Sequence, residues 1–152
     1  MTSTGQCQCG TLQYRLNERP LFVHACHCLD CQRRSGSAFG MTMIVLKKDF
    51  EVTAGRLKEE VISIRTTFHE CATCGVHIST TSTNFPVSIT LQAGTLNNAD
   101  WAKPGAHIWT KRMRPWLSLS PGTPHFEEGY DPQTTWPKES LERLKQALSQ
   151  QC

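Results

Sequence analysis

The chain has 152 residues and a mass of 17.1 kDa, which suits one domain with a buried core. No apolar stretch approaches the roughly 20 residues that a membrane-spanning helix needs, and the first residues lack the basic and apolar regions of a secretory signal peptide. We therefore expect a cytoplasmic protein with no membrane partner. The formal net charge of +3 fits binding of small anions and does not require a nucleic acid.

Most of the chain has the pattern of short β-strands. Apolar residues alternate with polar ones or form short apolar runs between turn residues, which is typical of half-buried or inner strands. The predicted strands are residues 11–16, 21–25, 38–46, 50–54, 61–65, 77–80 and 87–91. Several short strands at this spacing predict a mainly β fold of antiparallel sheets.

Two segments have helical features. Residues 28–35 are expected to form a short helix that ends at Gly36, and residues 137–149 a longer one with an apolar stripe of Leu141, Leu144 and Leu148. Residues 102–137 hold six of the eight prolines and are expected to pack as an extended flap. We expect one zinc-binding β domain over residues 1–125 and a C-terminal extension over 126–152 packed on it.

Seven of the eight cysteines lie in three tight clusters, which is the most informative feature of the sequence. Cys-x-Cys and Cys-x-x-Cys spacings would give strained disulfides, and small disulfide scaffolds are usually shorter than about 100 residues. A reducing cytosol also favours metal binding over disulfide bonds. The sequence therefore predicts zinc ligands, and the clusters are Cys7 and Cys9, then Cys26, Cys28 and Cys31, then Cys71 and Cys74.

The clusters divide into four ligands and three. The first and the last cluster each end in Cys-Gly, at Gly10 and Gly75, which indicates two matching turns that grip one ion. The alternative is a zinc ribbon made from Cys28, Cys31, Cys71 and Cys74. Its intervening gap of 39 residues far exceeds the ~15–20 typical of that pattern, and it would leave three cysteines unused.

Four thiolates close a tetrahedral site, whereas three leave one position open. We therefore expect a structural zinc at Cys7, Cys9, Cys71 and Cys74 and a second zinc at Cys26, Cys28 and Cys31. Three thiolates make the second site electron-rich, so it suits an incoming thiol better than a catalytic hydroxide. The sequence has no base-deaminase signature, because no Cys-x-x-Cys pair follows a proline.

The complete pattern is C-x-C-G, then C-H-C-x-x-C-Q-R-x-x-G, then C-x-x-C-G. Over about residues 3 to 120 it resembles the glutathione-dependent formaldehyde-activating enzyme family, which includes the centromere protein V-type zinc domains. The resemblance implies a zinc-stapled fold of antiparallel sheets with two zinc ions. It also implies a carbon–sulfur lyase that joins glutathione and formaldehyde reversibly to S-(hydroxymethyl)glutathione, with Cys26, Cys28 and Cys31 at the catalytic zinc.

Several other residues are weaker candidates. Arg33 and Arg34 follow the triple cluster and could bind a carboxylate of a glutathione-like substrate. His27 and Asp30 lie inside that cluster and could relay a proton or orient a ligand. The basic run of residues 111–114 is expected to be a solvated face, and Cys152 a free thiol.

Two questions stay open in the sequence. A non-catalytic zinc module that binds a protein or DNA partner is the alternative to the lyase, and it would need no exchangeable metal position. The sequence is also compatible with a homo-oligomer.

Overall fold

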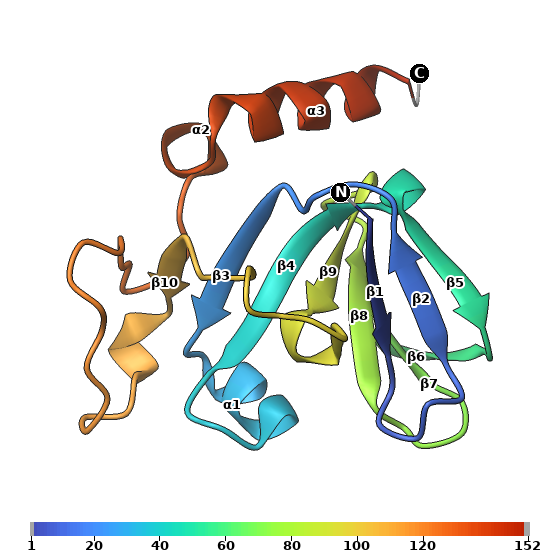
Figure 1. Cartoon of the computed structure of the whole chain (residues 1–152). Coiled ribbons are helices and arrows are strands. Elements are labelled where there is room, and N and C mark those ends of the chain that lie inside the picture. The colour runs from blue at the N-terminus through green and yellow to red at the C-terminus, as the bar shows by residue number, and fades with distance from the viewer. Residues whose placement is uncertain (1, 151–152) are drawn as a thin grey trace.

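The computed structural model describes residues 2–150, so Cys152 lies outside the described part of the chain. Two β-sheets form most of the structure. The strands are β1 (Ser3–Gln6), β2 (Gln13–Leu16), β3 (Phe22–Cys26), β4 (Gly40–Leu46), β5 (Phe50–Ala54), β6 (Leu57–Ser63), β7 (Thr66–Cys71), β8 (His77–Ser82), β9 (Ser88–Gln92) and β10 (Ala106–Ile108). The smaller sheet has the order β1-β2-β5, and the larger has the order β10-β3-β4-β9-β8-β7-β6 (Figure 1).

The mainly β fold class is confirmed, and the antiparallel arrangement holds for every strand pair except one. β10 pairs with β3 in parallel, because the chain crosses from β9, past β4 and β3, to the edge of the sheet before it forms β10. The remaining elements are helices. They are η1 (Lys47–Asp49), η2 (Ala93–Thr95), η3 (Thr110–Arg112), α1 (Leu29–Ser35), α2 (Pro132–Thr135) and α3 (Lys138–Ser149).

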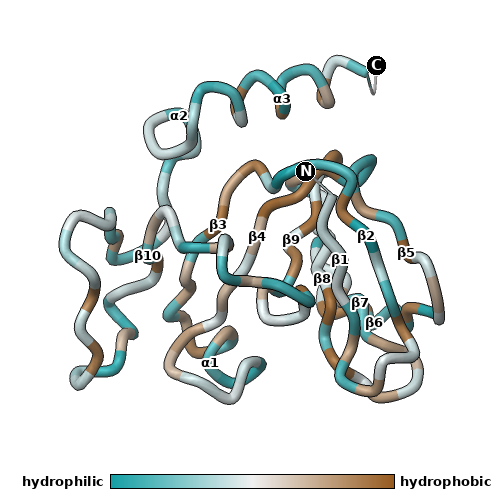
Figure 2. The backbone as a smooth tube through the Cα atoms, viewed as in Figure 1, coloured by the Kyte–Doolittle hydropathy of each residue, from teal (hydrophilic) through white to brown (hydrophobic). Residues whose placement is uncertain are grey.

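The main core lies between the two sheets. In β2 the buried residues alternate with exposed ones, so Tyr14 and Leu16 point inward. Met43 and Val45 of β4 belong to the same apolar cluster and are fully buried. Figure 2 shows that apolar segments are concentrated in the central strands, whereas α3 is largely hydrophilic. We call the face of the larger sheet that points away from this core its second face. Because it does not pack against the smaller sheet, it is available for other contacts.

The structure extends and corrects the predicted strands. Residues 61–65 were expected to be a strand, but β6 begins at Leu57 and ends at Ser63, and a turn follows. β6 is an edge strand whose side chains are almost all exposed. Because neither face of the strand is buried, its apolar and polar residues do not alternate, and the sequence does not mark its ends. β1, β7 and β10 were not predicted, and β10 lies inside the segment expected to be an extended flap.

The C-terminal helix covers one end of the second face of the larger sheet (Figure 1). Leu144 and Ala147 pack on a small apolar cluster that includes Leu21 and Leu46. The predicted stripe is partly wrong, because Leu148 is 44% exposed and Ala147 is buried in its place. Within the described residues, none of the helices combines the length and the apolar character that a bilayer crossing requires.

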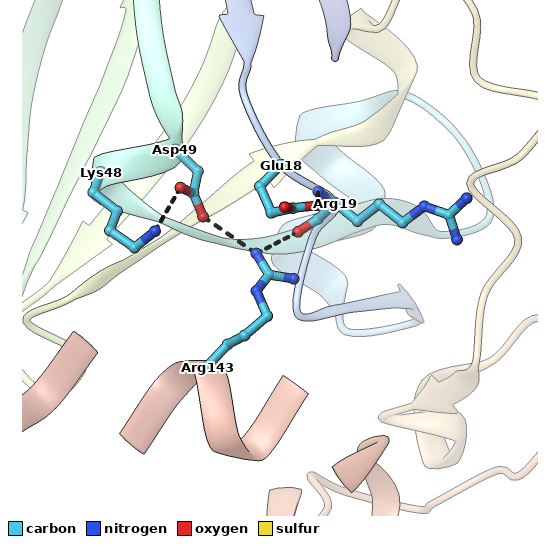
Figure 3. A network of polar contacts seen from close by, with 5 residues as sticks. All are labelled: Glu18, Arg19, Lys48, Asp49 and Arg143. Carbon is cyan, nitrogen blue, oxygen red and sulfur yellow. Dashed lines mark hydrogen bonds and ion pairs between the residues drawn. The ribbon is translucent and has the colours of Figure 1, made fainter. Parts of the chain in front are cut away.

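An ion pair ties α3 to the sheet beneath it. Arg143 Nη2 lies 3.2 Å from Asp49 Oδ2 and also donates to the backbone oxygen of Arg19 (Figure 3). Lys48 Nζ lies 2.9 Å from the other oxygen of Asp49, whose side chain is only 7% exposed. A buried carboxylate needs such partners, because an unpaired charge in the interior costs several kcal/mol.

We expect Arg143→Met to lower the free energy of unfolding by about 2 kcal/mol, since it removes a guanidinium partner from the buried carboxylate of Asp49. Lys145→Met changes an exposed residue of the same helix and should alter stability by less than about 0.5 kcal/mol. Denaturant unfolding of both variants measures the difference. Equal stability of the two variants would contradict the structural role of the pair.

Candidate metal centres

Four cysteines from two distant loops converge at one end of the two sheets. Cys7 and Cys9 lie in the loop between β1 and β2, whereas Cys71 ends β7 and Cys74 lies in the loop before β8. Their sulfur atoms all lie within 4.8 Å of one another. Cys7 and Cys71 are buried, and Cys9 and Cys74 are exposed.

The two loops have the same local geometry. The amide of Gly10 donates to the carbonyl oxygen of Cys7, and the amide of Gly75 donates to that of Cys71. Both glycines have positive φ angles, 74° and 73°, a conformation that other residues rarely adopt. The backbone freedom expected of Gly10 and Gly75 from the sequence is therefore confirmed. In each loop a backbone amide also donates to a cysteine sulfur, from Leu12 to Cys7 and from Thr73 to Cys71.

The donor set fits a zinc ion. Zinc–sulfur bonds of about 2.3 Å in a tetrahedron place the sulfurs about 3.8 Å apart, and Cys9 Sγ and Cys71 Sγ are 4.0 Å apart. Burial raises the pKa of the Cys7 thiol, whereas hydrogen bonds from Thr11 lower the pKa of Cys9 to about 6. A positive ion at the centre would favour the thiolate form of Cys7, which burial disfavours.

Three cysteines form a second cluster where β3 leads into α1. Cys26 ends β3, Cys28 is the N-cap of α1, and Cys31 lies in its first turn, where its amide donates to Cys28 Sγ. The helix ends at Gly36, whose φ of 62° confirms the predicted stop. The three sulfurs lie within 4.8 Å of one another, and no other Cys, His, Asp or Glu of residues 2–150 joins them.

Two thiols of this cluster, those of Cys28 and Cys31, have a raised pKa, which favours their protonated form. The neighbouring Cys26 and burial both raise the pKa of Cys31, and burial raises the pKa of Cys28. Three thiolates at this separation would repel one another in a half-buried environment. The cluster therefore fits a metal ion that has three protein ligands.

A pocket of about 340 Å³ adjoins the three-cysteine cluster. Its walls come from the second face of the larger sheet, the β6–β7 hairpin and α1. The lining residues are His24, Cys26, Asp30, Cys31, Arg34, Thr42, Ile62, Thr66, Phe68, Thr80 and Thr90. The pocket thus combines two of the clustered thiols with hydroxyl groups, an aromatic ring and one guanidinium group.

The structure separates Arg33 from Arg34. The guanidinium carbon of Arg34 lies 4.2 Å from the centre of the Phe68 ring, inside the pocket. Arg33 does not line this pocket, and its side chain is 75% exposed with Nη1 3.6 Å from Asp30 Oδ1. Arg34 therefore lines the pocket beside the three-cysteine cluster, whereas Arg33 does not.

Two histidines near the cluster differ in position. His27 is fully buried away from the pocket, and its Nε2 lies 3.0 Å from Nδ1 of His107 on β10. His24 lines the pocket, and burial lowers its pKa to about 4. Sequence reasoning favoured His27 because it lies between two cysteines. The alternation of β3 would have indicated His24, which shares a strand face with Cys26.

The basic run of residues 111–114 is largely exposed, in line with the solvated face expected from the sequence. Lys111 forms an ion pair with Glu128, and its ammonium group lies 5.1 Å from the centre of the Trp109 ring. Part of this positive charge is therefore already paired within the chain.

The fold and the clusters define the class of protein: a mainly β protein with two groups of cysteines that could each hold zinc. The sequence profile of the family described as glutathione-dependent formaldehyde-activating enzyme matches residues 2–112, which include all seven clustered cysteines. The chain belongs to this family. The match ends before α2 and α3.

Two curated relatives carry the provisional name glutathione-dependent formaldehyde-activating enzyme. The one from Penicillium rubens is 32% identical over 77 residues, which are 48% of this chain and 40% of the relative. The one from Sordaria macrospora is 32% identical over 71 residues, which are 45% of this chain and 30% of the relative. The chain therefore spans less than half the length of these relatives.

A crystal structure of a Rhodobacter sphaeroides protein, determined as a structural genomics target, has a similar fold. The TM-score is 0.53 with 20% sequence identity, over 66% of this chain and 96% of that protein. This likeness supports the fold alone.

We expect the double variant Cys7→Ser/Cys9→Ser to lose one zinc ion per chain and to unfold, because a structural zinc site can contribute on the order of 10 kcal/mol to folding. Cys152→Ser is the matched control and should keep the zinc content and the fold of the unchanged protein. Metal analysis and circular dichroism measure both properties. A folded double variant with undiminished zinc would contradict the grouping.

Proposed function

We propose that this chain is a zinc-dependent carbon–sulfur lyase that acts on a thiol–aldehyde adduct, with glutathione and formaldehyde as the substrates that the family suggests. The reaction joins the thiol sulfur to the aldehyde carbon to give S-(hydroxymethyl)glutathione, and it is reversible. The observation that carries the proposal is the opening of a three-cysteine cluster into a pocket of about 340 Å³.

The two clusters have different roles in this proposal. Cys7, Cys9, Cys71 and Cys74 hold a structural zinc, because four thiolates complete its coordination. Cys26, Cys28 and Cys31 would hold a catalytic zinc, and three protein ligands would allow the substrate sulfur to bind as well. When bound there, zinc would lower the pKa of the substrate thiol and so supply a thiolate at neutral pH.

The chain's own residues bind and orient the substrates. Cys26 and Cys31 line the pocket, so a metal held by the cluster would be reached from it, and Phe68 and Ile62 give the pocket an apolar wall. In the forward direction the thiol loses its proton, its sulfur bonds to the aldehyde carbon, and the former carbonyl oxygen takes up a proton. In the reverse direction the carbon–sulfur bond breaks and the sulfur leaves as a thiolate.

Arg34 is the proposed contact for a glutathione carboxylate. Its guanidinium group stacks on Phe68 and lines the same pocket as the cysteines, so it can bind a carboxylate while the thiol reaches the cluster. Arg33 is exposed and paired with Asp30, which makes it the weaker candidate of the two.

Magnetization-transfer NMR of formaldehyde and glutathione tests the reaction. Zinc-loaded protein should accelerate the exchange, and Cys31→Ser should reduce that acceleration by about 100-fold while the four-cysteine site keeps its zinc and the fold. A protein with both sites filled that leaves the exchange rate unchanged would favour the non-catalytic zinc module instead.

Arg34→Met should raise the KM for glutathione by about tenfold, because a charge-assisted hydrogen bond is worth roughly 1.5–3 kcal/mol. Arg33→Met is the matched comparison and should change the KM by less than about twofold. With 2-mercaptoethanol, which has no carboxylate, both variants should behave like the unchanged protein. Equal KM values for glutathione in the two variants would remove Arg34 from the substrate site.

A further inference from the structure

A hydrogen-bonded chain runs from the C-terminal segment to the wall of the pocket. Trp136 Nε1–H donates to the hydroxyl oxygen of Tyr130 at 3.0 Å, and that oxygen lies 2.9 Å from Nδ1 of His24. Tyr130 and Trp136 lie beyond the segment that the family profile matches, whereas His24 lines the pocket beside Cys26. A part of the molecule outside the family domain therefore contacts the proposed active site.

The donors and acceptors in this chain favour one tautomer of His24. The indole nitrogen of Trp136 can only donate, so the Tyr130 oxygen is its acceptor. The hydroxyl proton of Tyr130 then needs an acceptor of its own, and Nδ1 of His24 lies at hydrogen-bonding distance. We take Nδ1 as that acceptor, which places the hydrogen of the ring on Nε2.

Aromatic packing holds Tyr130 in this place. Phe22 contacts both Tyr130 and Trp136, at ring-centre distances of 5.4 Å and 5.9 Å, and the ring of Phe126 packs on Tyr130 at 5.8 Å. Burial raises the pKa of Tyr130 to about 12, so its hydroxyl keeps the proton that it donates. The Tyr130 hydroxyl thus remains a donor to His24 throughout the neutral pH range.

Thr42 adds a second polar group beside His24. The two residues are direct partners across β3 and β4, and both line the pocket. Thr42 is 3% exposed, and its Oγ1 is buried with no hydrogen-bond partner among residues 2–150. A buried hydroxyl without a partner is unfavourable, which points to a ligand atom as its missing partner.

We propose that the Nε2–H group of His24, with the Thr42 hydroxyl beside it, binds the oxygen atom of the aldehyde or of its thiol adduct, and that Tyr130 and Trp136 hold His24 in the tautomer this requires. The identity of the ligand rests on the proposed function. His24 and Thr42 contact the substrate, whereas Tyr130 and Trp136 are positioning residues.

The chemistry of the reaction needs such a site. As the thiol sulfur bonds to the aldehyde carbon, the electron pair of the carbonyl bond moves to the oxygen, which becomes negative before water protonates it. Donors fixed at that oxygen stabilise the charge as it develops. His24 donates a hydrogen bond and keeps its proton, so no proton transfer through the ring is required. In the reverse direction the same donors hold the hydroxymethyl oxygen.

Nitrogen-15 NMR of the histidine rings in the zinc-loaded full chain tests the tautomer without any turnover. His24 should carry its hydrogen on Nε2 in the unchanged protein, and Tyr130→Phe should shift the population toward the Nδ1–H form. Glu139→Gln, an exposed change on α3, is the matched control and should leave the tautomer as it is. A hydrogen on Nδ1 in the unchanged protein would overturn the proposal.

The exchange reaction tests the function of the same groups. Tyr130→Phe and Thr42→Val should each lower kcat by about tenfold and change the KM for glutathione by less than about twofold, since the thiol contacts remain. Thr42→Val should also keep or raise the melting temperature, because it removes a hydroxyl that has no partner.

The outcomes separate the two proposals. Exchange that is accelerated by the unchanged protein and equally by Tyr130→Phe and Thr42→Val would overturn the oxygen site and leave the lyase in place. No acceleration by the unchanged zinc-loaded protein would overturn both.

Discussion

Four cysteine sulfurs converge from loops of both sheets, so a cation bound by them would link one sheet to the other. Cys7 and Cys9 come from the β1–β2 loop of the smaller sheet, and Cys71 and Cys74 from the β7–β8 loop of the larger one. With 38% hydrophobic residues, the chain has a modest core to position these sheets by packing alone. Four thiolates at this separation would repel one another, whereas a cation bound by all four would remove that repulsion and cross-link the sheets.

Alternate residues of β3 and β4 point to opposite faces of the larger sheet, one toward the core and the other toward the pocket. Met43 and Val45 face the core between the sheets, whereas Thr42, one residue away from Met43, faces the pocket. His24 and Cys26 share that second face on the neighbouring strand. Because these polar residues stand on strands whose opposite face is packed, the site is held more rigidly than one built on loops.

Local sequence patterns could predict the cysteine groups but not the pocket. The Cys-Gly endings at Gly10 and Gly75 reflect a local backbone requirement, so they were visible in the sequence. The pocket wall depends on the pairing of β6 to β9, and β7 was missed because its Thr, His and Glu residues show no apolar period. The contact between His24 and Tyr130 joins residues 106 positions apart, and no local pattern indicates it. Sequence proximity to the cysteines indicated His27, while the three-dimensional arrangement places His24 at the pocket.

The C-terminal segment completes this division of the sheet. On the second face, the apolar end around Leu21 and Leu46 is covered by α3, and the polar part toward Cys26 remains as the pocket. Trp136 belongs to both parts, because its ring packs on the apolar cluster and its indole N–H begins the hydrogen-bonded chain to His24. One side chain therefore contributes both to the packing of the C-terminal segment and to the hydrogen bonds that reach the pocket histidine. The C-terminal segment, which lies beyond the residues that the family profile matches, thus reaches the wall of the pocket through His24.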